Sequence, residues 1–493
     1  MKNSHQIPNT SPIIEEEFFS KETKIHVRVA IFREFLKLNF SNKNEINYQV
    51  KDIIGCYIDE PYALNDHAVT LNIYTFPKQD GNKREKIVFQ LSYDKYNKKF
   101  TNLKKVVNFK KHIDHLIVTK DQRPFLVFLN PNSGSGKASK LMLYQVVSMW
   151  KLANVKFKII ETNFANHAKE VSQKIEVGNY RGIIVISGDG LVFEVLNGLL
   201  SRPDWKDAIK VPIGQIAAGS ANGLSSSIAF LSNENFMYDK IENFATLMSF
   251  MYAKSNPVPM DLVSIQLQNQ TFVNSFLNVE WAMVADVDFE SEQFRFLGGF
   301  RFVLGAIRRL MNLRKYRGRI SFLPADEMKN YTPKDSNLKV LRNTGNYSSE
   351  ELEEKRLVNP ELNIEYRFLK PLDEKVPNDW LTIEDSFVMF AAVNLPLMGI
   401  DFIISPETKL NDGSIMLTFV RDGAPKLRIL ELFNDAAKGK FLENKYIEFV
   451  KVKAFRLEPL DGHECGNIMI DGERVPYGPI QGEVLPQFAR ALQ

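Results

Sequence analysis

One stretch of the chain, residues 183–200, limits the folds open to it more than any other. Its first part, Ile183-Ile-Val-Ile-Ser187, is apolar and β-branched without polar alternation, which is typical of a buried parallel strand. Its last part, from Leu191 on, repeats leucine and valine at helical spacing. Gly188-Asp-Gly190 joins the two. A strand that enters a helix through glycines presents backbone amides at the sheet edge where α/β folds hold phosphate.

The aspartate in this junction, Asp189, allows two interpretations. A carboxylate repels phosphate, but it can hold a metal ion or accept a proton from a hydroxyl group. An aspartate at the start of a helix is also among the commonest N-caps. The third glycine of the dinucleotide-binding fingerprint is missing, because Phe193 stands in its place. The local pattern therefore indicates a phosphate-site geometry without naming a reaction.

Composition excludes some classes of protein. The chain has 493 residues, 44% of them hydrophobic, which suits roughly two to four domains. Its 63 basic and 59 acidic residues nearly balance, so global charge does not indicate nucleic-acid binding. Cys56 and Cys465 lie far apart and form no ligand or redox motif, which suits a reducing compartment.

The sequence predicts a soluble, cytoplasmic protein that at most associates peripherally with membranes. The N-terminal residues are polar and acidic, so no signal or transit peptide is expected. The most apolar stretch, residues 387–404, contains Asn394, Pro396 and Asp401, and it is interpreted as two buried strands rather than a membrane span.

Changes in pattern along the chain indicate four regions. Residues 1–24 are polar and predict a disordered tail. Residues 25–120 contain short β-rich runs between polar turns, which indicates a small antiparallel extension without visible chemistry. In residues 121–260 strands alternate with helices, which predicts a doubly wound parallel sheet whose loops converge on one edge. Residues 261–493 are mainly strands, with a charged insertion at about 326–365 that we expect to be flexible.

A second glycine-rich turn, Gly134-Ser-Gly-Lys137, is similar to a phosphate-binding loop but does not match the Walker A pattern. That motif requires glycine where Pro131 stands and Ser or Thr where Ala138 stands. The turn is either a simple strand-to-helix connection or a backbone cradle for a nucleotide phosphate.

Residues 293–325 contain eight basic residues and no acidic one. Apolar residues at helical spacing within them predict an amphipathic helix, and a solvated basic face is its ordinary explanation. The preference for arginine favours contact with phosphate or anionic lipid instead. If the helix begins upstream, one of its faces carries Asp288, Glu292 and Arg295. That face could bind both a cation and a phosphate. Ordinary pairing of Glu292 with Arg295 is the alternative.

Several motifs in order resemble those of sphingosine kinases, a group within the diacylglycerol-kinase-like lipid kinases. The resemblance runs from about residue 125 to 492, apart from the insertion, and does not cover residues 1–120. The motifs that carry it are Ser187-Gly-Asp-Gly190, Glu194-Val-Leu-Asn-Gly198, Arg202-Pro-Asp-Trp205, Ala218-Gly-Ser-Ala-Asn222, Ala285-Asp-Val-Asp-Phe-Glu-Ser-Glu292 and Asp471-Gly-Glu473.

The resemblance implies an α/β ATP-binding domain at 121–260 and an antiparallel β-sandwich lipid-binding domain at 261–493, with the active site in the cleft between them. It implies ATP- and Mg²⁺-dependent phosphorylation of the primary hydroxyl of a sphingoid base, with Asp189 as the catalytic base. The positions that match nucleotide contacts are Asn130, Pro131, Asn132, Thr162, Asn166, Gly190, Glu194, Gly219, Ser220, Ala221, Arg295, Arg301, Asp471, Gly472 and Glu473. Those assigned to the lipid are Ser187, Gly188, Met283, Val284, Asp288 and Phe302.

The expected partners are the sphingoid-base substrate and a membrane surface, and a homodimer is compatible with the resemblance. No protein ligand is assigned to Mg²⁺, which is expected to arrive with ATP. Asp288 would pair with the ammonium of the lipid, and this favours an amine-bearing lipid over diacylglycerol or ceramide. The apolar side of residues 297–311 is expected to line the lipid tail. The alternatives are a diacylglycerol or ceramide kinase of the same fold and a catalytically silent lipid-binding protein.

The chain departs from the family pattern at two places. It has Asn132-Ser133 where members often have Arg-Gly, and Ala221 where a glycine is usual. A backbone contact with the nucleotide is compatible with either change. A side-chain contact made by the family's arginine cannot be transferred to Asn132.

Overall fold

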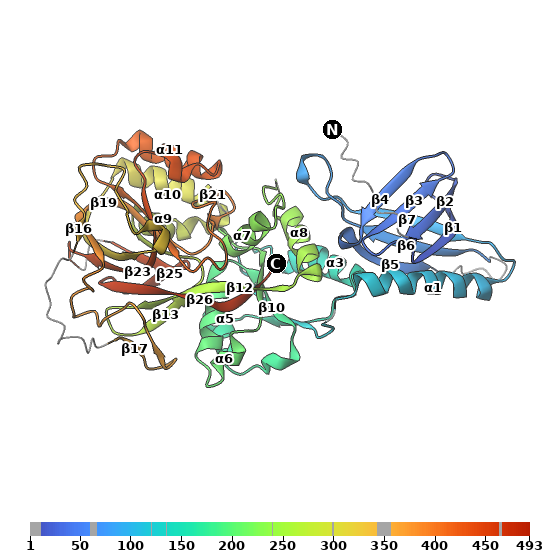
Figure 1. Ribbon diagram of the computed structural model, residues 1–493, viewed down its shortest axis with the longest axis horizontal. Coiled ribbons are helices and arrows are strands. Elements are labelled where there is room, and N and C mark those ends of the chain that lie inside the picture. Colours follow the sequence, from blue (N-terminus) through green and yellow to red (C-terminus); the bar gives the residue numbers. More distant parts are fainter. Residues whose placement is uncertain are drawn as a thin grey trace. The chain divides into compact units, whose positions relative to one another are not determined.

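The computed structural model describes residues 11–59, 67–119, 121–134, 136–238, 240–297, 300–342, 356–462 and 466–493 (Figure 1). The chain forms two compact units. The first comprises the chain up to residue 122 with residues 143–156 and 249–254, and the second comprises residues 123–142, 157–248 and 255–493.

The first unit is built on one antiparallel sheet in the order β4-β3-β2-β1-β7-β6-β5. Its strands are β1 (Ile14–Ser20), β2 (His26–Ile31), β3 (Phe35–Phe40), β4 (Glu45–Gln49), β5 (Ile53–Asp59), β6 (Val69–Thr75) and β7 (Ile87–Tyr93), with the short turns η1 (Val50–Asp52) and η2 (Asp80–Asn82). Helix α1 (Lys99–Ile117) buries Val106, Phe109 and Ile113 in the core of this sheet.

Two features of this unit differ from the sequence-based expectations. Strand β1 lies inside the predicted disordered tail, where Glu15, Glu17 and Phe19 are exposed and Phe18 packs into the core. It pairs with both β2 and β7, and such distant partners are invisible in a local charge pattern. Helix α1 was not expected in a β-rich extension. Residues 1–10 and Cys465 lie outside the described residues, and Cys56 is buried and forms no disulfide.

The second unit begins with a parallel sheet in the order β9-β8-β10-β11, as the alternating pattern predicts. Its strands are β8 (Phe125–Leu129), β9 (Phe157–Glu161), β10 (Gly182–Ser187) and β11 (Ile213–Ala217). The segments that follow these strands in the chain are α2 (Ala138–Leu141), a π-helical turn η3 (Met142–Val146), α3 (Val147–Leu152), α4 (His167–Ser172), η4 (Val177–Asn179), α5 (Asp189–Leu200), α6 (Trp205–Ala208), α7 (Gly223–Leu231) and α8 (Ile241–Lys254). Of these, residues 143–156, which include α3, and residues 249–254 of α8 belong to the first unit.

The rest of the second unit is mainly antiparallel, and the long strand β26 joins it to β11. Its strands are β12 (Pro257–Gln266), β13 (Phe272–Ser275), β14 (Asn278–Ala282), β15 (Tyr316–Pro324), β16 (Leu341–Arg342), β17 (Val358–Asn359), β18 (Ile364–Glu365), β19 (Leu381–Val393), β20 (Leu397–Gly399), β21 (Phe402–Ile403), β22 (Ile415–Arg421), β23 (Glu448–Pro459), β24 (Ile468–Ile470), β25 (Glu473–Val475) and β26 (Ile480–Leu492). Its helical segments are α9 (Met283–Ser291), η5 (Glu292–Leu297), α10 (Phe300–Met311), η6 (Asp326–Met328), α11 (Lys426–Ala437) and η7 (Phe441–Glu443).

Strand β19 lies at the centre of this region because both of its faces are buried. Phe387 and Phe390 face a core formed with other strands, whereas Val388 and Ala391 pack with residues of α9, α10 and α11. Figure 1 shows these three helices gathered over one side of the strands. The structure contains an α/β part, an antiparallel β-rich part and a β-rich extension that precedes both in the sequence. This confirms the predicted fold class.

The predicted flexibility of the insertion does not hold where the structure describes it. Residues 326–342 contain η6 and β16, and Tyr331 and Leu338 pack into the core of the strands. Glu448 accepts hydrogen bonds from the Tyr331 hydroxyl and from two backbone amides of the same segment. The charged composition of this segment predicted disorder. The prediction was wrong because composition does not reveal hydrogen bonds to a distant residue such as Glu448. Residues 343–355 lie outside the described residues.

Candidate active site

A cavity of about 940 Å³ lies in the second unit, lined by residues at the carboxyl ends of β8, β10 and β11 and by residues of the antiparallel part. This volume is typical of a small-molecule site. It brings together most of the residues that the sequence analysis selected. Those that line it are Asn130, Asn132, Ser187, Gly188, Asp189, Gly190, Glu194, Gly219, Ser220, Ala221, Met283, Val284, Asp288, Arg301, Phe302, Asp471, Gly472 and Glu473.

Three of the selected residues do not line the cavity. Pro131, Thr162 and Asn166 are absent from the lining. Thr162 lies at the same sheet edge, because its backbone amide donates to the Leu129 carbonyl at 2.8 Å. The side chain of Arg295 lies outside the described residues. Nucleotide contacts at these four positions therefore stay predictions.

Asp189 is the first residue of α5, yet its carboxylate does not cap that helix. Gly188 is the N-cap of α5, and the Asp189 oxygens accept hydrogen bonds from the amides of Gly223 at 2.9 Å and Leu224 at 3.2 Å. Gln215 Nε2 donates a third bond at 3.2 Å. The carboxylate thus binds the N-terminus of the neighbouring helix α7, where the helix dipole also favours negative charge.

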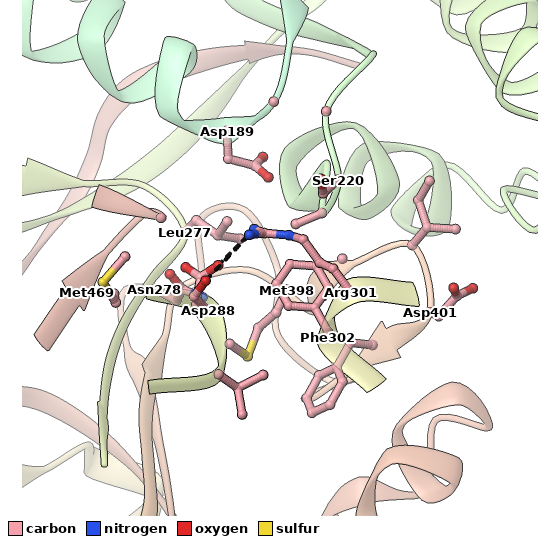
Figure 2. Close-up of a pocket in the computed structure, with 18 of the residues that line it drawn as sticks. Asp189, Ser220, Leu277, Asn278, Asp288, Arg301, Phe302, Met398, Asp401 and Met469 are labelled. Carbon is pink, nitrogen blue, oxygen red and sulfur yellow. Dashed lines mark hydrogen bonds and ion pairs between the residues drawn. The ribbon is translucent and has the colours of Figure 1, made fainter. Parts of the chain in front are cut away.

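The environment of Asp189 acts on its protonation in two directions. Burial raises the pKa of its carboxyl above the ordinary value, and the three hydrogen bonds oppose that rise because they favour the charged form. The side chain still borders the cavity (Figure 2). A carboxylate that is held in place and raised in pKa is suited to accept a proton from a bound hydroxyl group.

The glycines around Asp189 permit close approach of backbone segments. A Cβ at Gly190 would lie 2.5 Å from Glu473 Oε1, and one at Gly134 would lie 2.5 Å from the Ala218 carbonyl oxygen. Gly134 also has a φ of +56°, which favours glycine. The turn that begins at Gly134 therefore packs against the loop after β11 and contributes Gly134 to the cavity wall. This position supports the phosphate-cradle interpretation of that turn.

Arg301, on α10, and Asp288, on α9, form an ion pair at the cavity wall. Arg301 Nη2 lies 2.9 Å from Asp288 Oδ1, and Nη1 lies 2.6 Å from Glu292 Oε2 (Figure 2 draws the contact with Asp288). Burial lowers the pKa of Arg301, whereas burial raises the pKa of Asp288 and the arginine opposes that rise. The sequence assigned these two residues to different ligands, but here they neutralise each other.

The helix that carries Asp288 ends before it reaches Arg295. α9 ends at Ser291 and is followed by η5, in which Phe294 has non-helical dihedral angles. A single face shared by Asp288, Glu292 and Arg295 is therefore not formed. Arg301, from the next helix, reaches both carboxylates instead.

Helix α10 is turned the other way from the expectation. Arg301 and Arg309 are buried, and Arg309 pairs with Asp286 and Glu290. The apolar residues Phe300, Ile307 and Met311 are exposed. Four acidic side chains on α9 and η5 attract the two arginines inward, so the apolar stripe does not line a tail pocket as predicted. Of this helix, Arg301, Phe302 and Val303 line the cavity.

The apolar end of the cavity was missed in the sequence. It is lined by Met389 of β19, Met398 of β20, Phe402 of β21 and Ile429, Leu432 and Phe433 of α11. In Figure 2, Met398 and Phe302 lie in the same part of the cavity. These positions look like ordinary core residues, and no local pattern distinguishes them from core.

Asn278 and Glu280 at the start of β14 were also missed, and both line the cavity. A signal was present, because Asn278-Val-Glu-Trp-Ala282 places two polar residues two positions apart in an apolar strand, which puts both on one face.

Asp471 has a structural part that the sequence analysis did not consider. Its carboxylate is fully buried and accepts hydrogen bonds from Ser275 Oγ and from the amides of Phe276, Leu277 and Asn278, at 2.6 to 3.0 Å. Because these donors occupy its oxygens, the side chain fixes the turn between β13 and β14. A nucleotide contact from this residue would come from its backbone.

We expect Asp471 to make stability depend on pH. Burial raises the pKa of its carboxyl from 3.8 to about 7, so the folded chain holds this proton more tightly than the unfolded chain. Its contribution to stability is complete below pH 3.8 and is lost as the pH rises to about 7. The free energy of unfolding of the wild type, minus that of Asp471→Asn, should fall across this window by up to about 1.4 kcal/mol per unit.

Urea unfolding at several pH values measures this difference. Glu45→Gln serves as a control with the opposite sign, because hydrogen bonds from Lys37 and Asn47 lower the pKa of the exposed Glu45 carboxyl. A constant difference between wild type and Asp471→Asn from pH 4 to 7 would contradict the expectation.

Two family models match the chain, one over the α/β part and one within the antiparallel part, and both parts line the cavity. The model of the diacylglycerol kinase catalytic domain matches residues 124–250, and that of the YegS C-terminal NAD kinase beta sandwich-like domain matches residues 365–493. Together with the glycine-framed Asp189, they place the chain in the class of diacylglycerol-kinase-like lipid kinases.

Individual relatives narrow this class. The chain is 34% identical to sphingosine kinase 1 of Homo sapiens over 368 residues, which covers 74% of this chain and 89% of the relative. It is 34% identical to sphingosine kinase 1 of Arabidopsis thaliana, over 70% of this chain and 66% of the relative. A diacylglycerol kinase structure from Bacillus anthracis str. Sterne covers 76% of this chain and 98% of its own, at 17% identity and a TM-score of 0.45. The chain belongs to the sphingosine kinase family.

Proposed function

We propose that the chain transfers the γ-phosphoryl group of ATP to the primary hydroxyl of sphingosine or a related sphingoid base, giving the 1-phosphate. The observation that carries this is the meeting of three features at one cavity: Asp189 at a glycine-framed sheet edge, the buried Asp288–Arg301 pair, and an apolar end. Asp189 suits the hydroxyl group that accepts the phosphoryl group. The ion pair suits the ammonium of the lipid and the phosphates of ATP, and the apolar end suits the alkyl tail.

Asp189 orients the hydroxyl and accepts its proton. Phosphoryl transfer has a loose transition state, so positioning and charge neutralisation matter more than a strong base. The hydrogen bonds from α7 and Gln215 keep the carboxylate in one orientation. Its raised pKa makes proton acceptance easier near neutral pH.

The Asp288–Arg301 pair divides its charges between the two substrates. Arg301 offers a fork of N–H donors that suits phosphate oxygens. Asp288 offers a carboxylate to the ammonium of the lipid. Each buried charge is neutralised by the other before substrates bind, which avoids the cost of an unpaired buried ion. The resulting arrangement favours a substrate that brings a positive charge, as a sphingoid base does.

The residues present are compatible with Mg²⁺ that enters with ATP. Among the described residues, no group of three or more Asp, Glu, His or Cys side chains is placed to hold a metal ion. Mg²⁺ commonly takes one or two carboxylates together with phosphates and water. Glu473, whose carboxylate lies against Gly190 at the cavity, would supply one such ligand. Bound Mg²⁺ supplies charge neutralisation on the phosphates.

A panel of lipid acceptors tests the proposal. The purified chain with radiolabelled ATP and Mg²⁺ is offered sphingosine, diacylglycerol and ceramide in the same detergent micelles. We expect sphingosine to be phosphorylated with at least about tenfold higher kcat/KM, because only it offers Asp288 an ammonium. A preference for either lipid without the amine would reject the proposal in favour of another kinase of this fold.

The chain is proposed to act at a membrane surface. In the described part of the chain, no helix is long and apolar enough to cross a membrane. The exposed Phe300, Ile307 and Met311 lie on α10 with the exposed Arg308, a combination that suits the surface of an anionic bilayer. The homodimer and the cytoplasmic location stay predictions from the sequence.

A further inference from the structure

Three buried polar atoms that belong to cavity-lining residues have no hydrogen-bond partner within the residues that the structure describes. They are Asn278 Oδ1, Glu280 Oε2 and Arg301 Nε. Buried polar atoms are nearly always hydrogen-bonded, and leaving one unpaired costs stability. Three such atoms around one cavity indicate a ligand that satisfies them.

Asn278 and Glu280 form a rigid pair. They stand two residues apart on β14, so their side chains share one face of the strand. Asn278 Nδ2 donates to Glu280 Oε1 at 2.8 Å, and both side chains are more than nine-tenths buried. This bond uses one polar atom of each side chain, which leaves Asn278 Oδ1 and Glu280 Oε2 as two fixed positions for a ligand.

Glu280 differs in character from the nearby Asp288. Burial raises the pKa of Glu280 well above its ordinary value, and the negative charge of Asp288 raises it further. Burial and Asp288 favour the protonated form of Glu280, whereas the hydrogen bond from Asn278 and the charge of Arg301 oppose them. A protonated Glu280 can donate as well as accept a hydrogen bond. In that form its side chain suits a neutral hydroxyl group rather than a cation.

A count of polar groups narrows the substrate. Under the proposed function, Asp189 takes the primary hydroxyl and Asp288 takes the ammonium. With Arg301 assigned to phosphate oxygens, Asn278 Oδ1 and Glu280 Oε2 remain for the lipid. A 2-amino-1,3-diol then has one hydroxyl left for these two positions. A 2-amino-1,3,4-triol has two, on adjacent carbons, for the two adjacent side chains Asn278 and Glu280.

We propose that Glu280, together with Asn278, selects sphingoid bases with a second secondary hydroxyl, so that the preferred substrate is a 2-amino-1,3,4-triol rather than a 2-amino-1,3-diol. This inference rests on the proposed function. It assigns Glu280 to substrate specificity and not to the transfer step.

A competition assay tests the proposal. Sphinganine and 4-hydroxysphinganine of equal chain length are mixed in equal amounts with ATP and Mg²⁺, and the ratio of the two phosphorylated products is followed. We expect the wild type to prefer the triol by about tenfold. Glu280→Leu should bring the ratio close to one, and Glu280→Gln, which keeps hydrogen-bonding atoms of similar size, should retain most of the preference.

The ratio is measured within each variant, so a partial loss of folded protein does not alter it. Glu384→Leu is the matched control, because Glu384 pairs with Arg317 and Arg319 on β15 and does not line the cavity. Its ratio should equal that of the wild type. A wild-type ratio near one, or a ratio unchanged by Glu280→Leu, would overturn the specificity role while sphinganine is still phosphorylated. Phosphorylation of neither base would overturn the proposed function itself.

Discussion

Replacement of Asp189 by asparagine is expected to lower kcat by roughly 10²- to 10⁴-fold, the range for loss of a general base. An amide cannot accept the proton of the substrate hydroxyl. Asparagine also leaves one of the α7 amides facing an NH₂ group, because its side chain has a single acceptor oxygen where Asp189 serves Gly223 and Leu224. We therefore expect a loss of about 1–3 kcal/mol in the free energy of unfolding as well.

Two measurements separate the catalytic loss from the structural one. Steady-state kinetics gives kcat, and urea unfolding gives stability. Gln215→Met is the matched control, since Gln215 bonds the same carboxylate and the Ser225 amide but does not line the cavity. It should lose comparable stability and keep kcat within about tenfold. Equal losses of kcat in the two variants would show that Asp189 only caps α7 and is not the general base.

Replacement of Arg301 by methionine is expected to give the largest loss of stability, about 3–5 kcal/mol, since it leaves Asp288 in a buried position without its partner. It should also lower kcat by roughly 10²- to 10³-fold, because a donor to the transferring phosphoryl group is lost. Asp288→Asn should raise the KM for the lipid more than the KM for ATP. The double variant Arg301→Met/Asp288→Asn should regain much of the stability and none of the activity.

The same double-mutant cycle contains its own check. If the stability losses of the two single variants simply add in the double variant, the pair is not coupled and the proposed neutralisation is wrong. Arg319→Met is the control for loss of an arginine, because Arg319 pairs with Glu384 at a site that is 41% exposed. That change should cost no more than about 1 kcal/mol.

Much of the α/β part was predictable because its signals are local. The run at residues 182–187 is β10, and the leucine and valine spacing after it is α5. Once parallel strands are recognised, their carboxyl-end loops must share one edge, which brings Asn130, Ser187 and Gly219 to a single cavity. No distant contact was needed for these steps.

The predictions that did not hold concern segments whose structure depends on distant partners. The local sequence of β1 predicted disorder, because a run of charged residues does not indicate pairing with the distant strand β7. The apolar stripe of α10 was expected to face inward, but the carboxylates of α9 and η5 attract its arginines to the buried side. Hydrophobic periodicity identifies the apolar and polar faces of a helix. It does not predict which face is buried when acidic side chains of other elements lie next to the helix.

The sequence by itself determined the parallel sheet, the glycine-framed aspartate after β10 and the family to which the chain belongs, because each is encoded in short contiguous patterns. Only the tertiary structure decided what the charged groups bind. Asp189 meets the N-terminus of α7, Asp288 meets Arg301, and Asp471 fixes the turn before β14. The physical reason is that a buried charge must find a partner, and that partner is set by the packing of elements far apart in the chain.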